Sequence, residues 1–79
     1  MSEKLTTRLD LRGLKCPLPV LKARKAMRSI EVGELIELET TDPLAVIDIP
    51  AFCNENGHRL IETSEHEDHH VFVLEKGAI

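Results

Sequence analysis

The residues best suited to chemistry in this chain are its two cysteines, Cys16 and Cys53. A thiolate is a strong nucleophile and a ligand for soft metals. Two cysteines are too few for a disulfide scaffold, and these two lack the spacing of a metal site. No second cysteine follows Cys16 closely, so a dithiol redox motif is absent. The sequence therefore points to thiol chemistry at a single cysteine.

Cys16 precedes a segment that has the pattern of the first turn of a helix. Pro17 and Pro19 fit there because the first amides of a helix have no internal partner, so a missing N–H costs little. With Pro17 as the first helical residue, Cys16 is expected at the N-cap, where free amides and the helix dipole favour a thiolate. Arg12 and Lys15 would add positive potential. We therefore predict an exposed, nucleophilic Cys16 whose pKa lies below its ordinary value.

Other candidate residues have weaker signals. Cys53 lies beside Phe52 in an apolar segment, and we expect it to be a packed core residue. Asp10 could orient the loop of residues 12–15 by hydrogen bonding, and the spacing of His58 suggests no mechanism. A short charged turn could hold a metal, although such turns usually face solvent and we expect none here; its histidines are His66, His69 and His70.

The elements that must position Cys16 follow from two periodicities. Polar and apolar side chains alternate over residues 6–11 and again over residues 34–40, as in half-buried strands. Between them, apolar residues recur at helical spacing along one stripe, which consists of Val20, Ala23, Met27 and Ile30. The sequence predicts a strand, a helix from residue 17, and a second strand.

The second half of the chain predicts another helix and two strands. Asp42 and Pro43 are a helix-start signal, but Pro50 is costly inside a helix. We therefore expect a short turn first, then a helix capped by Asp48 that ends before Gly57. The two final strands are expected to be joined by a charged turn over residues 65–69, and they cover residues 59–63 and 71–75.

The predicted element order, β-α-β-α-β-β, indicates the fold class. Helices must cover an apolar sheet face, so we expect a two-layer α/β sandwich with two helices on one face of a four-stranded mixed sheet. Mixed strand directions follow from helical crossovers early in the chain and a hairpin at its end. Residues 1–79 are expected to form one domain.

The charge is unevenly distributed along the chain. Residues 1–28 hold eight basic and two acidic side chains, a net +6, whereas residues 29–79 hold two basic and twelve acidic ones, a net −10. A basic patch around one site is one interpretation, and a pair of solvated faces is the other. On the first interpretation, four residues lie on the side of the Cys16 loop and draw an acidic partner surface: Arg12, Lys15, Lys22 and Lys25.

Composition weighs against several other classes of protein. The only aromatic residues are Phe52 and Phe72, which leaves little for stacking on bases, so we expect no direct nucleic-acid binding. The first residues are polar, and no apolar run approaches the length of a membrane span. We expect a cytoplasmic protein with reduced thiols and no membrane association.

Two separated stretches resemble one known family. Residues 9–20, which contain the run Cys16-Pro17-Leu18-Pro19, look like the signature of the TusA-like sulfur-carrier family with its Cys-Pro-x-Pro motif. Residues 41–43, 48–53 and 57–58 resemble that family's second block. The likeness covers nearly the whole chain, and the family's fold has the β-α-β-α-β-β order expected above.

The resemblance implies a sulfurtransferase of the carrier kind. Cys16 would accept sulfane sulfur as a persulfide from a donor such as a cysteine desulfurase or a rhodanese, and relay it to an acceptor protein. No cofactor is implied, and a monomer suits a carrier that docks with successive partners. Family members feed tRNA thiolation, molybdenum-cofactor synthesis or sulfur oxidation, and the sequence does not separate these pathways. Two alternatives stay open: a protein- or RNA-binding regulatory module without sulfur transfer, and a peroxide-reactive thiol.

Overall fold

The computed structural model describes residues 6–78 of the chain. Its elements follow the predicted order. They are β1 (Thr6–Leu11), α1 (Leu18–Met27), β2 (Leu35–Thr40), α2 (Ala45–Asn56), β3 (Arg59–Glu65) and β4 (His70–Glu75). Among these residues, no helix has both the length and the hydropathy needed to cross a membrane.

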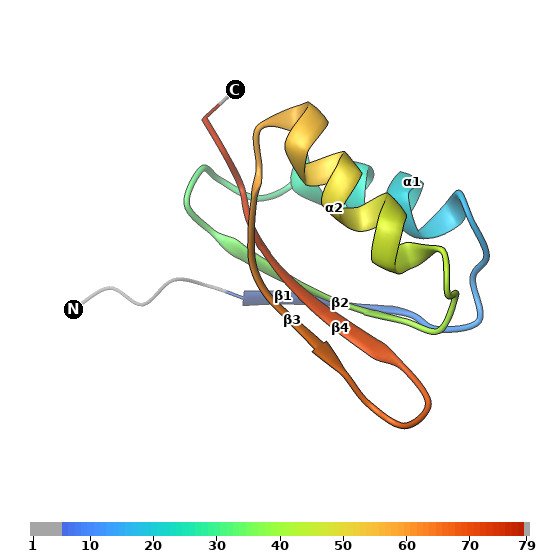
Figure 1. Cartoon of the computed structure of the whole chain (residues 1–79). Coiled ribbons are helices and arrows are strands. Elements are labelled where there is room, and N and C mark those ends of the chain that lie inside the picture. Colours follow the sequence, from blue (N-terminus) through green and yellow to red (C-terminus); the bar gives the residue numbers. More distant parts are fainter. Residues whose placement is uncertain (1–5, 79) are drawn as a thin grey trace.

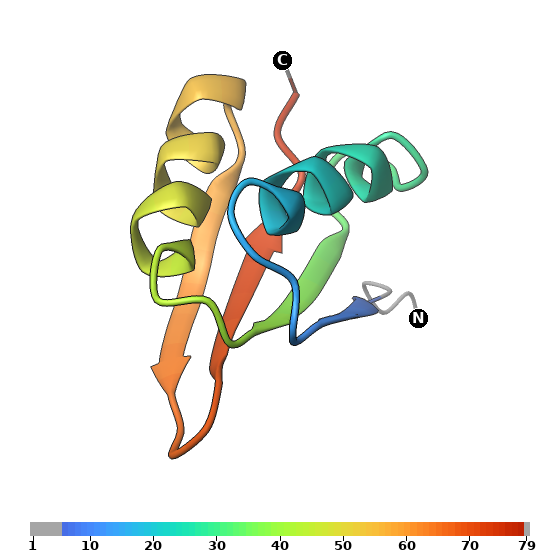
Figure 2. The same cartoon turned by 90° about the vertical axis from the view of Figure 1, so that its right-hand side faces the viewer.

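The sheet and the helices form two layers, as predicted. The strand order is β1-β2-β4-β3, with β1 parallel to β2 and the other neighbours antiparallel. Both helices lie on one face of this mixed sheet (Figure 1). Figure 2 shows α1 above the β1–β2 side and α2 above the β3–β4 side. The parallel pair arises because α1 crosses over between β1 and β2, whereas the hairpin from β3 to β4 must be antiparallel.

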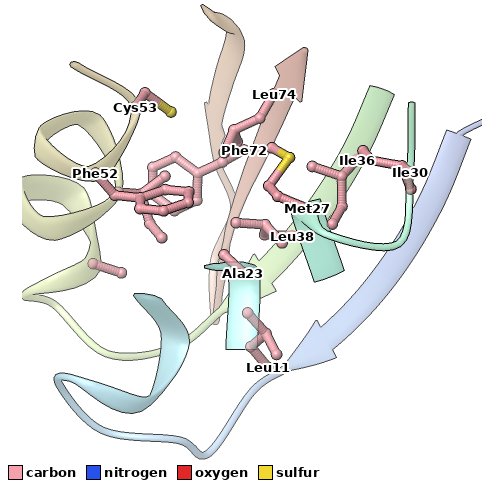
Figure 3. Packing of buried hydrophobic residues seen from close by; sticks show 12 residues of the cluster. Leu11, Ala23, Met27, Ile30, Ile36, Leu38, Phe52, Cys53, Phe72 and Leu74 are labelled. Atoms are coloured by element: carbon pink, nitrogen blue, oxygen red, sulfur yellow. The ribbon is translucent and has the colours of Figure 1, made fainter. Parts of the chain in front are cut away.

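The core lies between the two layers and is built from the predicted periodicities. Alternate residues of β2 and β4, among them Ile36, Leu38 and Phe72, turn inward and are fully buried (Figure 3). The stripe predicted for the first helix is confirmed through Met27, since Ala23 and Met27 are buried and Val20 packs against the core. Ile30 is also buried, but it lies beyond the end of α1. This packing fixes α1 on the sheet, and with it the loop that carries Cys16.

The start of α1 differs from the prediction by one residue. Pro17 occupies the N-cap position and Leu18 is the first helical residue, so Cys16 precedes the cap instead of forming it. Pro19 is buried in the first turn, where its missing N–H costs little, as expected. The N-cap makes no side-chain hydrogen bond to the helix. The expectation that Cys16 caps this helix is therefore wrong.

The start of α2 also differs, because the helix does not break at Pro50. Asp42 and Pro43 open a turn, as expected, in which the Asp42 carbonyl accepts the Ala45 N–H at 3.0 Å. The helix then runs from Ala45 to Asn56 without a restart at Asp48. Pro50 removes one backbone hydrogen bond in the interior of the helix, and the burial of its neighbour Ile49 in the core favours the helix despite this loss.

The remaining boundaries are close to those expected. Gly57 ends α2 in the left-handed conformation with φ of 74°, which glycine adopts without strain, as the sequence predicted. The strands β3 and β4 extend the predicted ranges to Glu65 and back to His70. The hairpin between them is therefore tighter than the charged turn expected from composition.

Candidate functional site

Cys16 lies exposed in the loop between β1 and α1, and its peptide bond to Pro17 is cis. Because β1 and β2 are parallel, the loops that follow them emerge at the same edge of the sheet, where both helices begin (Figure 2). The first residues of α1 and α2 therefore lie on either side of the thiol. The predicted exposure of Cys16 is confirmed.

Hydrogen bonds join these two loops directly. The Gly13 N–H donates to the Thr41 hydroxyl at 2.8 Å, and the Cys16 N–H donates to Asp42 Oδ2 at 2.6 Å. The other carboxylate oxygen of Asp42 accepts the Leu44 N–H at 3.3 Å. A single carboxylate thus fixes the backbone of Cys16 relative to the start of α2.

The electrostatics at the thiol are the reverse of the prediction. A hydrogen bond from the thiol to the Asp48 carboxylate raises the pKa of Cys16, and smaller contributions come from desolvation and from the negative charges of Asp48 and Asp42. Both carboxylates belong to the second loop and helix, so the local pattern around Cys16 did not reveal them. The expected low pKa is wrong, because the Asp48 and Asp42 carboxylates and desolvation favour the protonated thiol.

The positive potential that Arg12 was expected to add at Cys16 is also reduced, because Arg12 pairs with Asp10. Arg12 binds the Asp10 carboxylate through Nε at 2.9 Å and through Nη2 at 3.0 Å, and its backbone N–H binds the same group at 3.1 Å. This pairing lowers the pKa of Asp10 to about 2 and raises that of Arg12. Asp10 therefore orients the loop as the sequence suggested. Lys15 is exposed, and its carbonyl accepts the Leu18 N–H at 2.8 Å, which holds the turn before α1.

A shallow groove of about 260 Å³ runs from Cys16 between the two helices. Its lining combines apolar and charged side chains from both helices: Pro17, Val20, Arg24, Asp48, Ala51, Phe52 and Glu55. The guanidinium carbon of Arg24 lies 5.8 Å from the centre of the Phe52 ring. Arg24, Asp48 and Glu55 were missed as site residues, although Arg24 follows Val20 by one helical turn on the same face.

Lys22 and Lys25 do not share this groove. They line a second groove on the other side of α1, next to β1. The expectation that they lie with Cys16 on one basic side is wrong, because residues 22 and 25 face away from residues 20 and 24 on a helix. Arg24 is the basic residue of α1 that lies at the thiol.

Cys53 and the histidines make structural contacts. Cys53 is 3% exposed in the core, as expected, and this burial raises its pKa to about 11. His58 packs on Phe52 and accepts the Gly77 N–H at Nδ1, at 3.0 Å, while burial and Lys76 lower its pKa. The hairpin histidines pair with nearby carboxylates, His69 with Asp68 and His70 with Glu65. Within residues 6–78, no group of three or more His, Cys, Asp or Glu side chains is arranged to hold a metal ion.

Comparison with known proteins gives a consistent result. The family model described as Sulfurtransferase TusA matches residues 7–76. A putative sulfur carrier protein of Neisseria meningitidis is 44% identical over 66 residues, which are 84% of this chain and 86% of the relative. The sulfur carrier protein TusA of Allochromatium vinosum is 37% identical over 68 residues, which are 86% of this chain and 90% of that protein.

A solved structure shares the fold. The crystal structure of a SirA-like protein from Desulfitobacterium hafniense superimposes with a TM-score of 0.80 at 20% identity, covering 92% of this chain and 99% of the other. The identity is low, so this likeness concerns the fold alone. The family match extends over both the Cys16 loop and the segment that carries Asp42 and Asp48. The chain therefore belongs to the TusA family of sulfurtransferases, whose members among its relatives are named sulfur carrier proteins.

Proposed function

We propose that Cys16 is the residue of this sulfur carrier that receives and releases sulfur. The observation that supports this most directly is its exposed thiol at the shared edge of both helix starts, at the mouth of a groove that is open to another protein. Cys53, the other thiol, is buried and its raised pKa disfavours the reactive thiolate.

The transfer needs no external oxidant or reductant, because one S–S bond forms as another breaks. The sulfur of Cys16 attacks the outer sulfur of the donor persulfide, a new S–S bond forms at Cys16, and the donor's own S–S bond breaks. The donor cysteine leaves with the electron pair and takes up the proton that Cys16 loses. Asp48 lines the same groove as Cys16, and its carboxylate raises the pKa of the thiol that must lose this proton.

A raised pKa gives the free carrier a mostly protonated thiol at neutral pH. Because oxidants react mainly with the thiolate, this state protects Cys16 between transfers. We infer that the docked partner supplies the positive charge that ionises Cys16. Pro17 restricts the loop backbone directly after Cys16, and Pro19, buried in the first turn of α1, anchors the start of the helix; together they would hold the sulfur outward for both partners.

The surroundings of Cys16 suit a protein partner. Large apolar side chains are exposed at the start of each helix, with Leu18 at 42%, Leu44 at 50% and Ile47 at 64%. Such side chains form the centre of many protein–protein interfaces. The partners that we propose are a donor such as a cysteine desulfurase or a rhodanese, and a downstream acceptor protein in tRNA thiolation, molybdenum-cofactor synthesis or sulfur oxidation.

The test is a mass measurement after incubation with a cysteine desulfurase and cysteine. The chain should gain the mass of one sulfur atom, and a reductant should remove it. Cys16→Ser should abolish the gain, while Cys53→Ser, the matched control at the other cysteine, should keep most of it. A mass gain that is lost in the Cys53 variant and kept in the Cys16 variant would show that Cys53, and not Cys16, carries the sulfur. A folded chain that gains no sulfur from either a desulfurase or a rhodanese would instead favour a binding module.

A further inference from the structure

A second groove of the structure does not contain Cys16. It has a volume of about 410 Å³ and lies between α1 and β1. Its floor is mostly apolar, and two lysines stand on the α1 side: the lining residues are Leu9, Asp10, Leu11, Leu14, Lys22, Lys25, Ala26 and Ser29. Neither lysine forms an ion pair with any of residues 6–78. The groove therefore offers apolar surface beside two free positive charges.

The strand next to this groove is an edge strand. β1 stands at one end of the strand order, and its only neighbour among the described strands is β2. In an edge strand, the N–H and C=O groups of alternate residues point away from the sheet and can pair with another extended chain. β1 is six residues long, contains no proline and pairs with β2 without a register shift.

The opposite edge strand, β3, differs from β1 because its pairing is irregular. β3 carries an irregularity between Leu60 and Glu62, which twists the strand and interrupts regular pairing. Proteins use such bulges to protect an edge against unwanted strand addition. β1 has no such protection, so it is the edge of this sheet that is suited to pairing.

We propose that β1 and this groove together bind an extended segment of a partner protein, whose inward side chains alternate between apolar and acidic. The segment's backbone pairs with the free edge of β1, which is a common mode of peptide recognition. Every second side chain then points toward the α1 side, as Leu9 and Leu11 do. Apolar side chains contact Leu9, Leu14 and Ala26, and the carboxylates meet Lys22 and Lys25.

Charge decides against a second copy of this chain as the occupant. Two copies joined through their β1 edges would place the Lys22 and Lys25 pairs of both molecules near the same seam, where like charges repel. The only acidic lining residue, Asp10, is already bound by Arg12. An acidic segment of another protein relieves this excess of positive charge.

This binding is separate from sulfur transfer, because the two grooves lie on opposite sides of α1 and share no lining residue. A partner tethered through β1 leaves Cys16 and its groove accessible. Replacing Cys16 by Ser should therefore leave segment binding unchanged. The mass measurement tests sulfur transfer at Cys16 and peptide binding tests the β1 site, so either proposal can fail while the other holds.

The probe is an eight-residue peptide with threonine at every second position and with valine and glutamate alternating between. Titrated into the ¹⁵N-labelled chain, it should shift the amide signals of β1 and of residues 22–26, and slow hydrogen exchange in β1. Signals of β3 should not move. A matched peptide with lysine in place of glutamate should bind at least about tenfold more weakly, since two attractive charge pairs become repulsive.

Variants on one helix supply the matched control. The double reversal Lys22→Glu with Lys25→Glu should weaken binding of the acidic peptide about tenfold. The double reversal Arg24→Glu with Arg28→Glu changes the net charge of the chain by the same amount, but neither residue lines this groove. It should alter binding of the acidic peptide less than about twofold. Equal effects of the two reversals, equal binding of both peptides, or no response of β1 at millimolar peptide would each overturn the proposal. Sedimentation that shows the free chain pairing through β1 would overturn it as well.

Discussion

At the scale of single residues, the unexpected feature is that a cysteine suited to nucleophilic chemistry lies beside two carboxylates. Asp48 accepts a hydrogen bond from the Cys16 thiol and Asp42 adds negative charge, so both favour the protonated form. Arg12 is near in sequence but is engaged by Asp10. The resting thiol is therefore shielded by its surroundings, and its reactivity depends on which groups a partner brings.

A first prediction concerns this pair of residues. Asp48→Asn removes the negative charge that holds the proton on Cys16, so the pKa of Cys16 should fall and its alkylation by iodoacetamide near pH 7 should become several-fold faster. The measurement is the alkylation rate across pH, followed by mass spectrometry in a Cys53→Ser background.

Glu55→Gln is the matched control, because Glu55 lines the same groove but does not contribute to the pKa of Cys16. It should leave the alkylation profile nearly unchanged. An Asp48 variant that reacts no faster than the parent chain would show that Asp48 does not control ionisation of the thiol.

At the scale of the elements, the site depends on how two loops are held together. The Asp42 carboxylate accepts one N–H from the Cys16 loop and one from its own turn. Each of these is a hydrogen bond to a charged group, which contributes more to stability than a neutral one. The connection fixes the distance between the start of α1 and the start of α2, and so the position of Asp48 at the thiol.

A second prediction follows from this connection. Asp42→Ala should lower the free energy of unfolding by about 1–3 kcal/mol, because two backbone N–H groups lose their acceptor. Asp42→Asn retains one acceptor oxygen and should lose less. Urea unfolding followed by circular dichroism measures both. If the alanine variant has the same free energy of unfolding as the parent chain, water replaces the carboxylate as acceptor without loss of stability.

At the scale of the whole molecule, a small core supports two open surfaces. The buried residues come from β1, α1, β2, α2 and β4 or from positions next to them, and β3 contributes none. Phe72, the largest fully buried side chain, lies on the central strand β4 between the sheet and the helices (Figure 3). Since so few residues are buried, a single ionisable group among them affects the stability of the whole fold. Cys53 is that group.

A third prediction uses the pKa of Cys53, which burial raises to about 11 from about 9. Between these two values the unfolded chain loses the thiol proton while the folded chain keeps it. The free energy of unfolding should therefore fall as pH rises from about 9 to about 11, by about 2 kcal/mol.

Chemical unfolding at a series of pH values, in a Cys16→Ser background, gives this slope. Cys53→Ala removes the thiol and should make the stability curve flatter over the same interval, although it lowers stability at every pH through the lost volume. Parallel curves for the two proteins would show that other groups cause the alkaline loss.

The elements and their layers could be predicted from the sequence, because they depend on short-range periodicity. Alternation along residues 6–11 and the apolar stripe through Ala23 and Met27 each specify an element and the face that it buries. The position of Cys16 before a proline-containing helix start also predicted an exposed thiol, since the backbone there has few alternatives.

The charge environment of that thiol, and the distribution of the basic residues between the two grooves, became visible in the three-dimensional structure. The parallel pairing of β1 and β2 brings the loop of Asp42 and the first turns of α2 next to Cys16, although they are distant in the chain. Electrostatic interactions depend on distance in space, so Asp48 raises the pKa of Cys16 although the two residues are distant in the chain. For the same reason, the packing of α1 on the sheet, and not the count of lysines, placed Lys22 and Lys25 beside β1 and left Arg24 at the thiol.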